Sequence, residues 1–352
     1  MTASRVPVLG ITMGDPAGVG PEIIAKALER PAVVSTCRAM VVGDRSVMAA
    51  ALELLRSPLA LHAVGSPAEC RFAPDTIECL DLGAMDAARL RKASVSAEAG
   101  RAAYAYIETA VRLCQSGAID GMVTAPVNKE ALAAAGVPHS GHTEILAKLS
   151  GTTDFAMLLM GEALNVIHVT THVALRRVPD LVTRERVLRV IRLAQLAMTG
   201  LGRPRARIAV CGLNPHAGED GLFGDDEKER IIPAVEDARR EGLDVSGPLP
   251  ADTLFSRARG GEFDIVVAMY HDQGHVPVKT LGFTYDEASG TWTGLSGVNV
   301  TVGLPFLRVS VDHGTAFDRA WKGSANPESM VEAIEVAVRM LAARPGAPAG
   351  RA

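Results

Sequence analysis

Three histidines occupy places in this chain where side chains can do chemistry. His271 follows the apolar, β-branched run that starts at Ile265, and His172 and His216 each follow a further predicted strand. In open α/β sheets, ligands bind at the carboxyl ends of the strands. Three imidazoles from three such loops can hold one divalent cation and leave positions open for a substrate. The pattern therefore favours a metal site over three separate structural histidines.

One further histidine tests this interpretation. His168 and His172 stand four residues apart, which on a helix would be a zinc signature. On the strand predicted here their rings lie roughly 13 Å apart, at a rise of about 3.3 Å per residue. One metal cannot bind both. We therefore predict His172 as the ligand and His168 as a core histidine with a local hydrogen bond.

Other polar side chains could complete such a site. Asp252 and Asp272 could orient the histidines or act as further ligands, although Asp252 could equally cap a helix. Lys279, Asn299 and Arg308 offer donors for a phosphate or carboxylate. A bound metal would lower the pKa of a coordinated hydroxyl, which suits either hydrolysis or alcohol oxidation.

Two loops add to the polar residues. The segment 139–144 holds His142, Thr143 and a second histidine around a glycine, which suits substrate hydrogen bonding better than core packing. The segment 14–22 has three glycines and could cradle a phosphate on its backbone N–H groups. It matches neither the Rossmann nor the Walker pattern, and a tight strand-to-helix turn explains it equally well.

The elements that must position these residues alternate between strand and helix. Ser96, Asn128 and Thr183 are predicted helix N-caps, and Pro233 predicts a kink or late start in the helix at 226–240. The polar stretch 280–297 is predicted to be a hairpin or surface loop. A length of 352 residues predicts two lobes.

Bulk composition excludes several classes of protein. The net charge of −4 gives no reason to expect nucleic acid or an anionic membrane as a partner. No apolar run reaches the roughly 18 residues of a membrane span, and no signal-peptide pattern is present. The five cysteines are scattered, which predicts reduced thiols in a cytoplasmic protein.

Longer strings carry a family resemblance. Segments 14–22, 124–129, 141–144, 171–172, 212–219, 270–274 and 310–316 closely resemble the 4-hydroxythreonine-4-phosphate dehydrogenase family. The resemblance extends from about residue 8 to 340. It implies a two-lobed α/β fold like that of isocitrate and isopropylmalate dehydrogenases, with a mostly parallel sheet and no Rossmann fingerprint. We expect residues 1–127 and 306–352 to form the first lobe, and 128–305 to form the second, with the metal ligands and a homodimer interface.

The resemblance also implies roles for residues. His172, His216 and His271 match the metal ligands, with His271 coming from the partner subunit. The metal would be Zn, Mg, Mn or Co, and the dinucleotide NAD or NADP, with no cofactor-binding residue assigned. The matched substrate contacts are His142, Thr143, Lys279, Asn299 and Arg308. Catalytic roles are expected for His142, Asp252, Asp272 and Lys279, and the base that takes the hydroxyl proton is either His142 or a nearby lysine.

The reaction implied is oxidation and decarboxylation of a 4-phosphorylated four-carbon β-hydroxy acid. The expected substrate is 4-phosphooxy-threonine, as in pyridoxine biosynthesis. The loop at about 283–295 is longer than in the vitamin B6 enzymes, which keeps 4-phospho-D-threonate or D-erythronate open, as well as a carboxylated aromatic cis-dihydrodiol. A non-catalytic phosphosugar-binding protein would not explain the intact histidines, and a zinc hydrolase would need a His-Glu-x-x-His motif.

Overall fold

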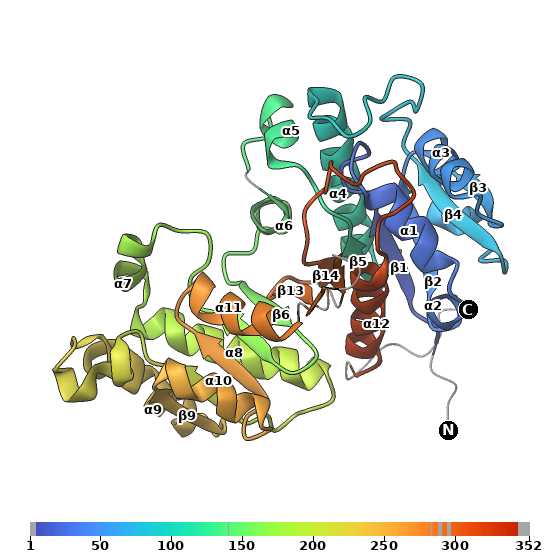
Figure 1. Cartoon of the computed structure of the whole chain (residues 1–352). Helices are drawn as coiled ribbons and strands as arrows, with labels where there is room; N and C mark the ends of the chain where they lie inside the picture. Colours follow the sequence, from blue (N-terminus) through green and yellow to red (C-terminus); the bar gives the residue numbers. More distant parts are fainter. Residues whose placement is uncertain (1–4, 140, 283, 288–290, 294–296, 344–352) are drawn as a thin grey trace. The chain divides into compact units, whose positions relative to one another are not determined.

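The computed structural model describes residues 5–139, 141–282, 284–287, 291–293 and 297–343. These residues form two compact units. The first unit contains the described residues of 1–153 and 304–342, and the second contains those of 154–303. Each unit is an α/β body built on its own run of adjacent strands (Figure 1).

In the first unit the strands are parallel. Their order is β3 (Ala60–Val64), β4 (Thr76–Asp81), β2 (Arg38–Gly43), β1 (Val8–Thr12), β5 (Gly121–Thr124) and β14 (Leu307–Val311). Every residue of β1, β5 and β14 is buried. Parallel strands covered on both faces read as continuous apolar runs, which is why the sequence signals them clearly.

The helices of the first unit include α1 (Gly20–Leu28), α3 (Arg45–Leu55), α4 (Ala97–Ser116), α5 (Lys129–Ala134), α6 (His142–Ser150) and α12 (Glu328–Ala342). The Ser96 side chain accepts a hydrogen bond from Ala99 N, and Asn128 accepts one from Ala131 N. Both predicted N-caps are therefore confirmed.

The second unit has the strand order β13 (Val298–Val302), β6 (Ala156–Met160), β7 (Asn165–His168), β10 (Ile265–Ala268), β8 (Ile208–Cys211) and β9 (Val245–Leu249). From β7 to β9 the neighbours are parallel, whereas β6 runs antiparallel to β7 and to β13. The predicted α/β fold with a mostly parallel sheet is confirmed.

Helices cover both faces of the strands of the second unit. Leu254 of α10 (Ala251–Arg259) and Val278 of α11 (His271–Gly282) pack on one face, against Val166, Ala209 and Val266. Side chains alternate along a strand, so the neighbouring buried residues point to the opposite face. That face is packed by α8 (Arg184–Gly200) and α9 (Ile232–Arg240).

Three details of the second unit follow the sequence. Thr183 caps α8 by accepting from Arg186 N. A π-helical turn, Glu227–Ile231, precedes α9, which places Pro233 in the first turn of α9, as the expected late start requires. Strands β11 (Thr284–Asp286) and β12 (Thr291–Thr293) pair antiparallel, so the predicted hairpin is present. Residues 283, 288–290 and 294–296 of that loop lie outside the described residues.

Two local expectations were wrong. Helix α10 begins at Ala251 after Pro250, so Asp252 lies in its first turn and caps nothing. The carboxylate there still favours the helix, because its charge complements the helix dipole. His271 does not lie in a loop but begins α11, with Pro277 inside the helix. The side chain of Gln273 accepts from Met269 N and so supports the helix start.

The second unit begins at Asp154, whereas the second lobe was expected to begin at residue 128. Helices α5 and α6 both pack on α4. Gly100 of α4 lies so close to the Ala131 backbone that a Cβ there would clash with it. This close contact holds the segment 128–153 in the first unit. Among the described helices, none has the length and apolar character needed to cross a bilayer.

Candidate functional site

The three predicted metal ligands follow three adjacent parallel strands. Strand β10 lies between β7 and β8, and Val266 is in register with Val166 on one side and Ala209 on the other. His172, His271 and His216 come after β7, β10 and β8, respectively. Because neighbouring strands are about 4.8 Å apart, their carboxyl ends present the three segments at one edge of the sheet.

His271 has the surroundings of a metal-binding imidazole. Its Nδ1 lies 2.7 Å from Oδ1 of Asp272. An ionised carboxylate only accepts hydrogen bonds, so a neutral ring in this contact would carry its proton on Nδ1 and offer Nε2 to a metal. A carboxylate behind the ring is the usual partner of a metal-bound histidine. The ring centroid of His172 lies 5.6 Å from that of His271.

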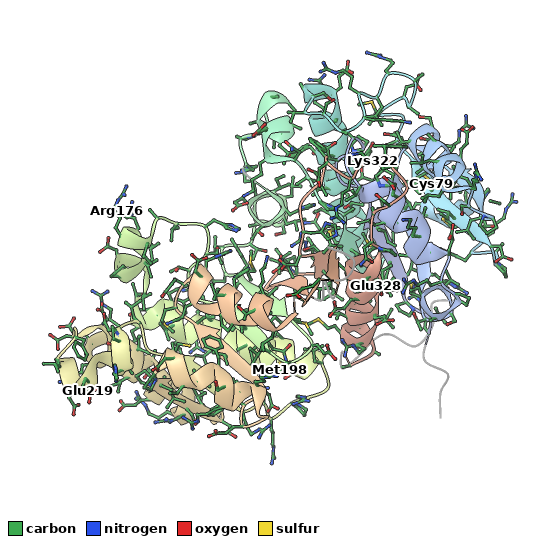
Figure 2. All side chains as sticks on the ribbon, viewed as in Figure 1. Cys79, Arg176, Met198, Glu219, Lys322 and Glu328 are labelled. Carbon is green, nitrogen blue, oxygen red and sulfur yellow. The ribbon has the colours of Figure 1, made fainter. Side chains whose placement is uncertain are left out.

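His216 also has a carboxylate near its Nδ1, but at a longer distance and between two exposed side chains. Its Nδ1 lies 3.5 Å from Oε2 of Glu219, whose exposed side chain is labelled in Figure 2. His216 and Glu219 both have positive φ angles, as do the residues between them. The left-handed turn brings the carboxylate to the ring.

One chain does not gather all three histidines. Among the described residues, no group of three or more His, Cys, Asp or Glu side chains is arranged to hold a metal ion. His172 and His271 are neighbours, and the ring contact of His216 is with Phe223 at 6.1 Å. The expectation that His271 serves a site on the partner subunit stays a prediction.

A pair of buried histidines lies behind the predicted ligands. His168 is fully buried and its Nδ1 lies 3.1 Å from the Met157 carbonyl oxygen, so the prediction of a core histidine with a local hydrogen bond is confirmed. Burial lowers the pKa of His168 to about 3, so it is neutral. His275, which sequence reasoning missed, stacks on His271 with 3.7 Å between ring centroids. His275 follows His271 by four residues, and residues with this spacing are neighbours on one face of a helix. A prediction of the helix would therefore have indicated this contact.

In the first unit, Arg308 is a buried cation and the second residue of β14. Its Nε and Nη2 donate to Oγ1 of Thr124 on the neighbouring strand β5, at 3.1 and 2.8 Å. Burial lowers the pKa of Arg308 to about 9, and the charge of Glu144 opposes this shift. The lowered pKa of Arg308 means that the effect of burial exceeds that of the nearby negative charge. The guanidinium is therefore only partly compensated, and its surroundings suit an anionic ligand.

His142 lies in the first turn of α6, next to Thr143. Its Nε2 is buried and has no hydrogen-bond partner among the described residues. Burial, and then the charge of Arg308, hold the pKa of His142 well below its ordinary value. The ring is therefore neutral at physiological pH, in the form that can accept a proton from a substrate.

The other predicted residues take their places in the second unit. Asp252 lies in the first turn of α10, Lys279 in the last part of α11, and Asn299 on β13 opposite Leu159. The first unit thus carries His142, Thr143 and Arg308. The second carries His172, His216, Asp252, His271, Asp272, Lys279 and Asn299.

Chain packing accounts for the glycines of the segment 14–22. Gly14 has φ +72°, and a Cβ there would clash with the Pro126 carbonyl oxygen. A Cβ on Gly18 would lie 2.9 Å from Thr315 Cβ. These contacts favour the tight-turn interpretation over a phosphate cradle. Asp15 in this turn is buried, and burial raises its pKa to about 6.

Comparisons with known proteins agree across the chain. Residues 35–337 match the family described as pyridoxal phosphate biosynthetic protein PdxA. The chain is 50% identical over 340 residues to D-threonate 4-phosphate dehydrogenase of Cupriavidus necator, covering 96% of this chain and 98% of that protein. It is 44% identical over 338 residues to 4-hydroxythreonine-4-phosphate dehydrogenase of Desulforapulum autotrophicum, covering 96% of each. A crystal structure of a 4-hydroxythreonine-4-phosphate dehydrogenase from Burkholderia phymatum is similar at a TM-score of 0.82 and 48% identity, covering 96% of this chain and 99% of that one.

Proposed function

Because the chain belongs to the family of the pyridoxal phosphate biosynthetic protein PdxA, we propose that it is a dehydrogenase that oxidises and decarboxylates D-threonate 4-phosphate. The substrate expected from the sequence is 4-phosphooxy-threonine. The higher identity to the D-threonate relative, 50% against 44%, favours the sugar acid instead. The hairpin of β11 and β12 in the longer loop supports the same choice.

The two substrates differ in charge. D-threonate 4-phosphate carries a neutral hydroxyl at the carbon where the amino acid carries an ammonium group. Both carry a carboxylate, a phosphate and the hydroxyl that is oxidised. The donors and metal ligands proposed here serve those shared groups, so the choice between the substrates rests on the relatives and on the loop.

The observation that carries metal dependence is the pair of carboxylate-backed imidazoles. Asp272 lies 2.7 Å from His271 Nδ1, and Glu219 lies 3.5 Å from His216 Nδ1. A carboxylate on the Nδ1 side leaves Nε2 of a neutral ring for a cation, so this donor set would fit a divalent metal. With His172, these rings would hold it. When bound, the metal supplies positive charge for the oxygen that loses its proton and for the product of decarboxylation.

The chain's own residues then have defined tasks. We assign His142 to take the hydroxyl proton, because its buried ring is neutral and its Nε2 has no partner among the described residues. Arg308 binds the phosphate or the carboxylate, because its charge is buried. Lys279 and Asn299 supply further donors, and Asp252, in the first turn of α10, is assigned an acidic role near the substrate and metal. The family implies a nicotinamide cofactor, NAD or NADP, as the hydride acceptor.

We further propose a homodimer in which His271 completes the site of the partner subunit. Exposed apolar side chains on α11 support this. Val276 is 60% exposed and Leu281 is 37% exposed, on the helix that His271 begins. Burying them against a second copy would remove apolar surface from water. The free cysteines are compatible with a cytoplasmic location, where thiols stay reduced.

The test is formation of reduced nicotinamide with each candidate substrate. The purified protein would be assayed with NAD or NADP and with Mg²⁺, Mn²⁺, Co²⁺ or Zn²⁺, against D-threonate 4-phosphate, D-erythronate 4-phosphate, 4-phosphooxy-threonine and a carboxylated cis-dihydrodiol. We expect the highest kcat/KM with D-threonate 4-phosphate and no turnover after chelation. Preference for 4-phosphooxy-threonine would refute the substrate assignment, and full activity without metal would refute metal dependence. Binding of the phosphorylated acid without any turnover would support a binding protein.

A further inference from the structure

The segment that carries His216 has an unusual backbone. His216, Ala217, Glu219 and Asp220 all have φ between 44° and 54°, and Gly218 has φ 84°. A left-handed conformation costs a residue with a Cβ roughly 1–2 kcal/mol. A run of left-handed residues persists only where the surrounding structure holds it in place. Backbone strain of this kind is found most often at functional sites.

One buried carboxylate holds the residues at the entry to this segment. Glu227, at the start of the π-helical turn, is 2% exposed. Its Oε1 accepts from Leu213 N at 2.7 Å and from Asn214 N at 2.8 Å. Its Oε2 accepts from Asn214 Nδ2 at 3.0 Å. Two backbone N–H groups and one side-chain amide donate to this carboxylate, which fixes the backbone just before His216.

Packing shows that the segment wraps around this carboxylate. A Cβ on Gly218 would lie 2.7 Å from Oε2 of Glu227. A Cβ on Gly212 would lie 2.7 Å from Cα of Ala217. Both glycines are therefore required by the closeness of the loop, and the loop has no room to move toward Glu227.

We propose that Glu227 is the positioning residue for His216. This inference rests on the proposed role of His216 as a metal ligand. Glu227 does not touch the metal itself. It fixes the entry to the left-handed turn, and the turn fixes both the His216 ring and the carboxylate of Glu219 behind it. Loss of Glu227 should therefore weaken metal binding while leaving the anion site around Arg308 unchanged.

The test measures metal affinity directly. Metal-free full-length wild type, Glu227→Ala and Glu227→Gln would be titrated with Co²⁺, following visible absorption in competition with a chelator. Glu229→Gln is the matched control, because it makes the same charge change two residues away on an exposed side chain. Loss of an outer partner typically costs 10- to 100-fold in metal affinity. We expect a loss of that size for Glu227→Ala, at least about tenfold for Glu227→Gln, and none for Glu229→Gln.

Glu227→Gln keeps one oxygen acceptor but places an NH₂ group opposite Asn214 Nδ2, so it remains informative if the alanine variant does not fold. Thermal unfolding of the metal-free proteins distinguishes a positioning role of Glu227 from a purely structural one. A purely structural residue would change the melting temperature and leave the Co²⁺ affinity of the folded protein at the wild-type value, which would overturn the inference. Wild type that binds no Co²⁺ would instead overturn the proposed metal function.

Discussion

Thr124 offers a sharp test of the anion site, because it holds Arg308 through a single oxygen. Oγ1 of Thr124 accepts from both Nε and Nη2 of Arg308, and both side chains are buried. Thr124→Val keeps the shape of the side chain and removes only this acceptor. Thr124→Ser keeps the acceptor and removes only a methyl group. The pair therefore isolates the hydrogen bonds from the packing.

The magnitude follows from burial. A hydrogen bond to a charged group contributes about 1.5–3 kcal/mol. If the misplaced Arg308 contributes about 2 kcal/mol less to the free energy of substrate binding, KM for the phosphorylated substrate rises about 30-fold, because 1.4 kcal/mol corresponds to a factor of ten. We expect kcat to change little, because binding that is equal in the ground and transition states affects KM alone.

Initial rates of reduced nicotinamide formation would be measured across substrate concentrations for wild type, Thr124→Val and Thr124→Ser. The serine variant should restore KM to within a few-fold of wild type. Equal KM in all three proteins would show that Thr124 does not position Arg308. A fall in kcat at unchanged KM would mean that Arg308 acts in the transition state instead of in binding.

Three further outcomes are expected. His216→Ala should lose turnover and bound metal together, and an active, metal-free variant after gel filtration would refute the ligand role. Arg308→Ala should mainly raise KM for the phosphorylated substrate with metal content unchanged, and an unchanged KM would remove Arg308 from the anion site. Burial raises the pKa of Asp15 from 3.8 to about 6, so the folded protein favours the protonated form of this side chain. The contribution of Asp15 to the free energy of unfolding is therefore fully present below pH 3.8 and is lost as the pH rises through about 6. The wild type loses roughly 3 kcal/mol of stability by pH 7. The free energy of unfolding of Asp15→Asn, measured in urea, should therefore rise relative to that of wild type between pH 4 and 7. Parallel pH profiles of the two proteins would contradict this.

The features that the sequence predicted are those set by local chemistry. Strands buried on both faces read as apolar runs, and the caps at Ser96, Asn128 and Thr183 need only the next few residues. The polar residues after those strands could be located for the same reason. Placing the three histidine segments at one sheet edge also requires the order of β7, β10 and β8, which local patterns do not contain.

The features that the sequence did not predict depend on contacts between residues far apart in the chain. Helix α11 was hidden because Gly274 and Pro277 resemble helix breakers. Gly274 is in fact required because a Cβ there would clash with Nε2 of His168. Thr124 and Arg308 meet only because β5 and β14 are neighbours although 184 residues separate the pair. Glu227 lies in a charged stretch that resembles a solvated helix, and its burial comes from the turn that folds over it.

One side chain links the strand exits that carry two of the proposed ligands. Oε1 of Gln273 accepts from Met269 N at the end of β10, and its Nε2 donates to the Gly212 carbonyl oxygen at the end of β8, at 2.7 and 2.8 Å. Gln273 thus joins the start of the His271 helix to the start of the His216 segment. Because both exits are tied to each other and to the sheet, the imidazoles take their positions from rigid elements, which is what a metal site needs to keep its geometry.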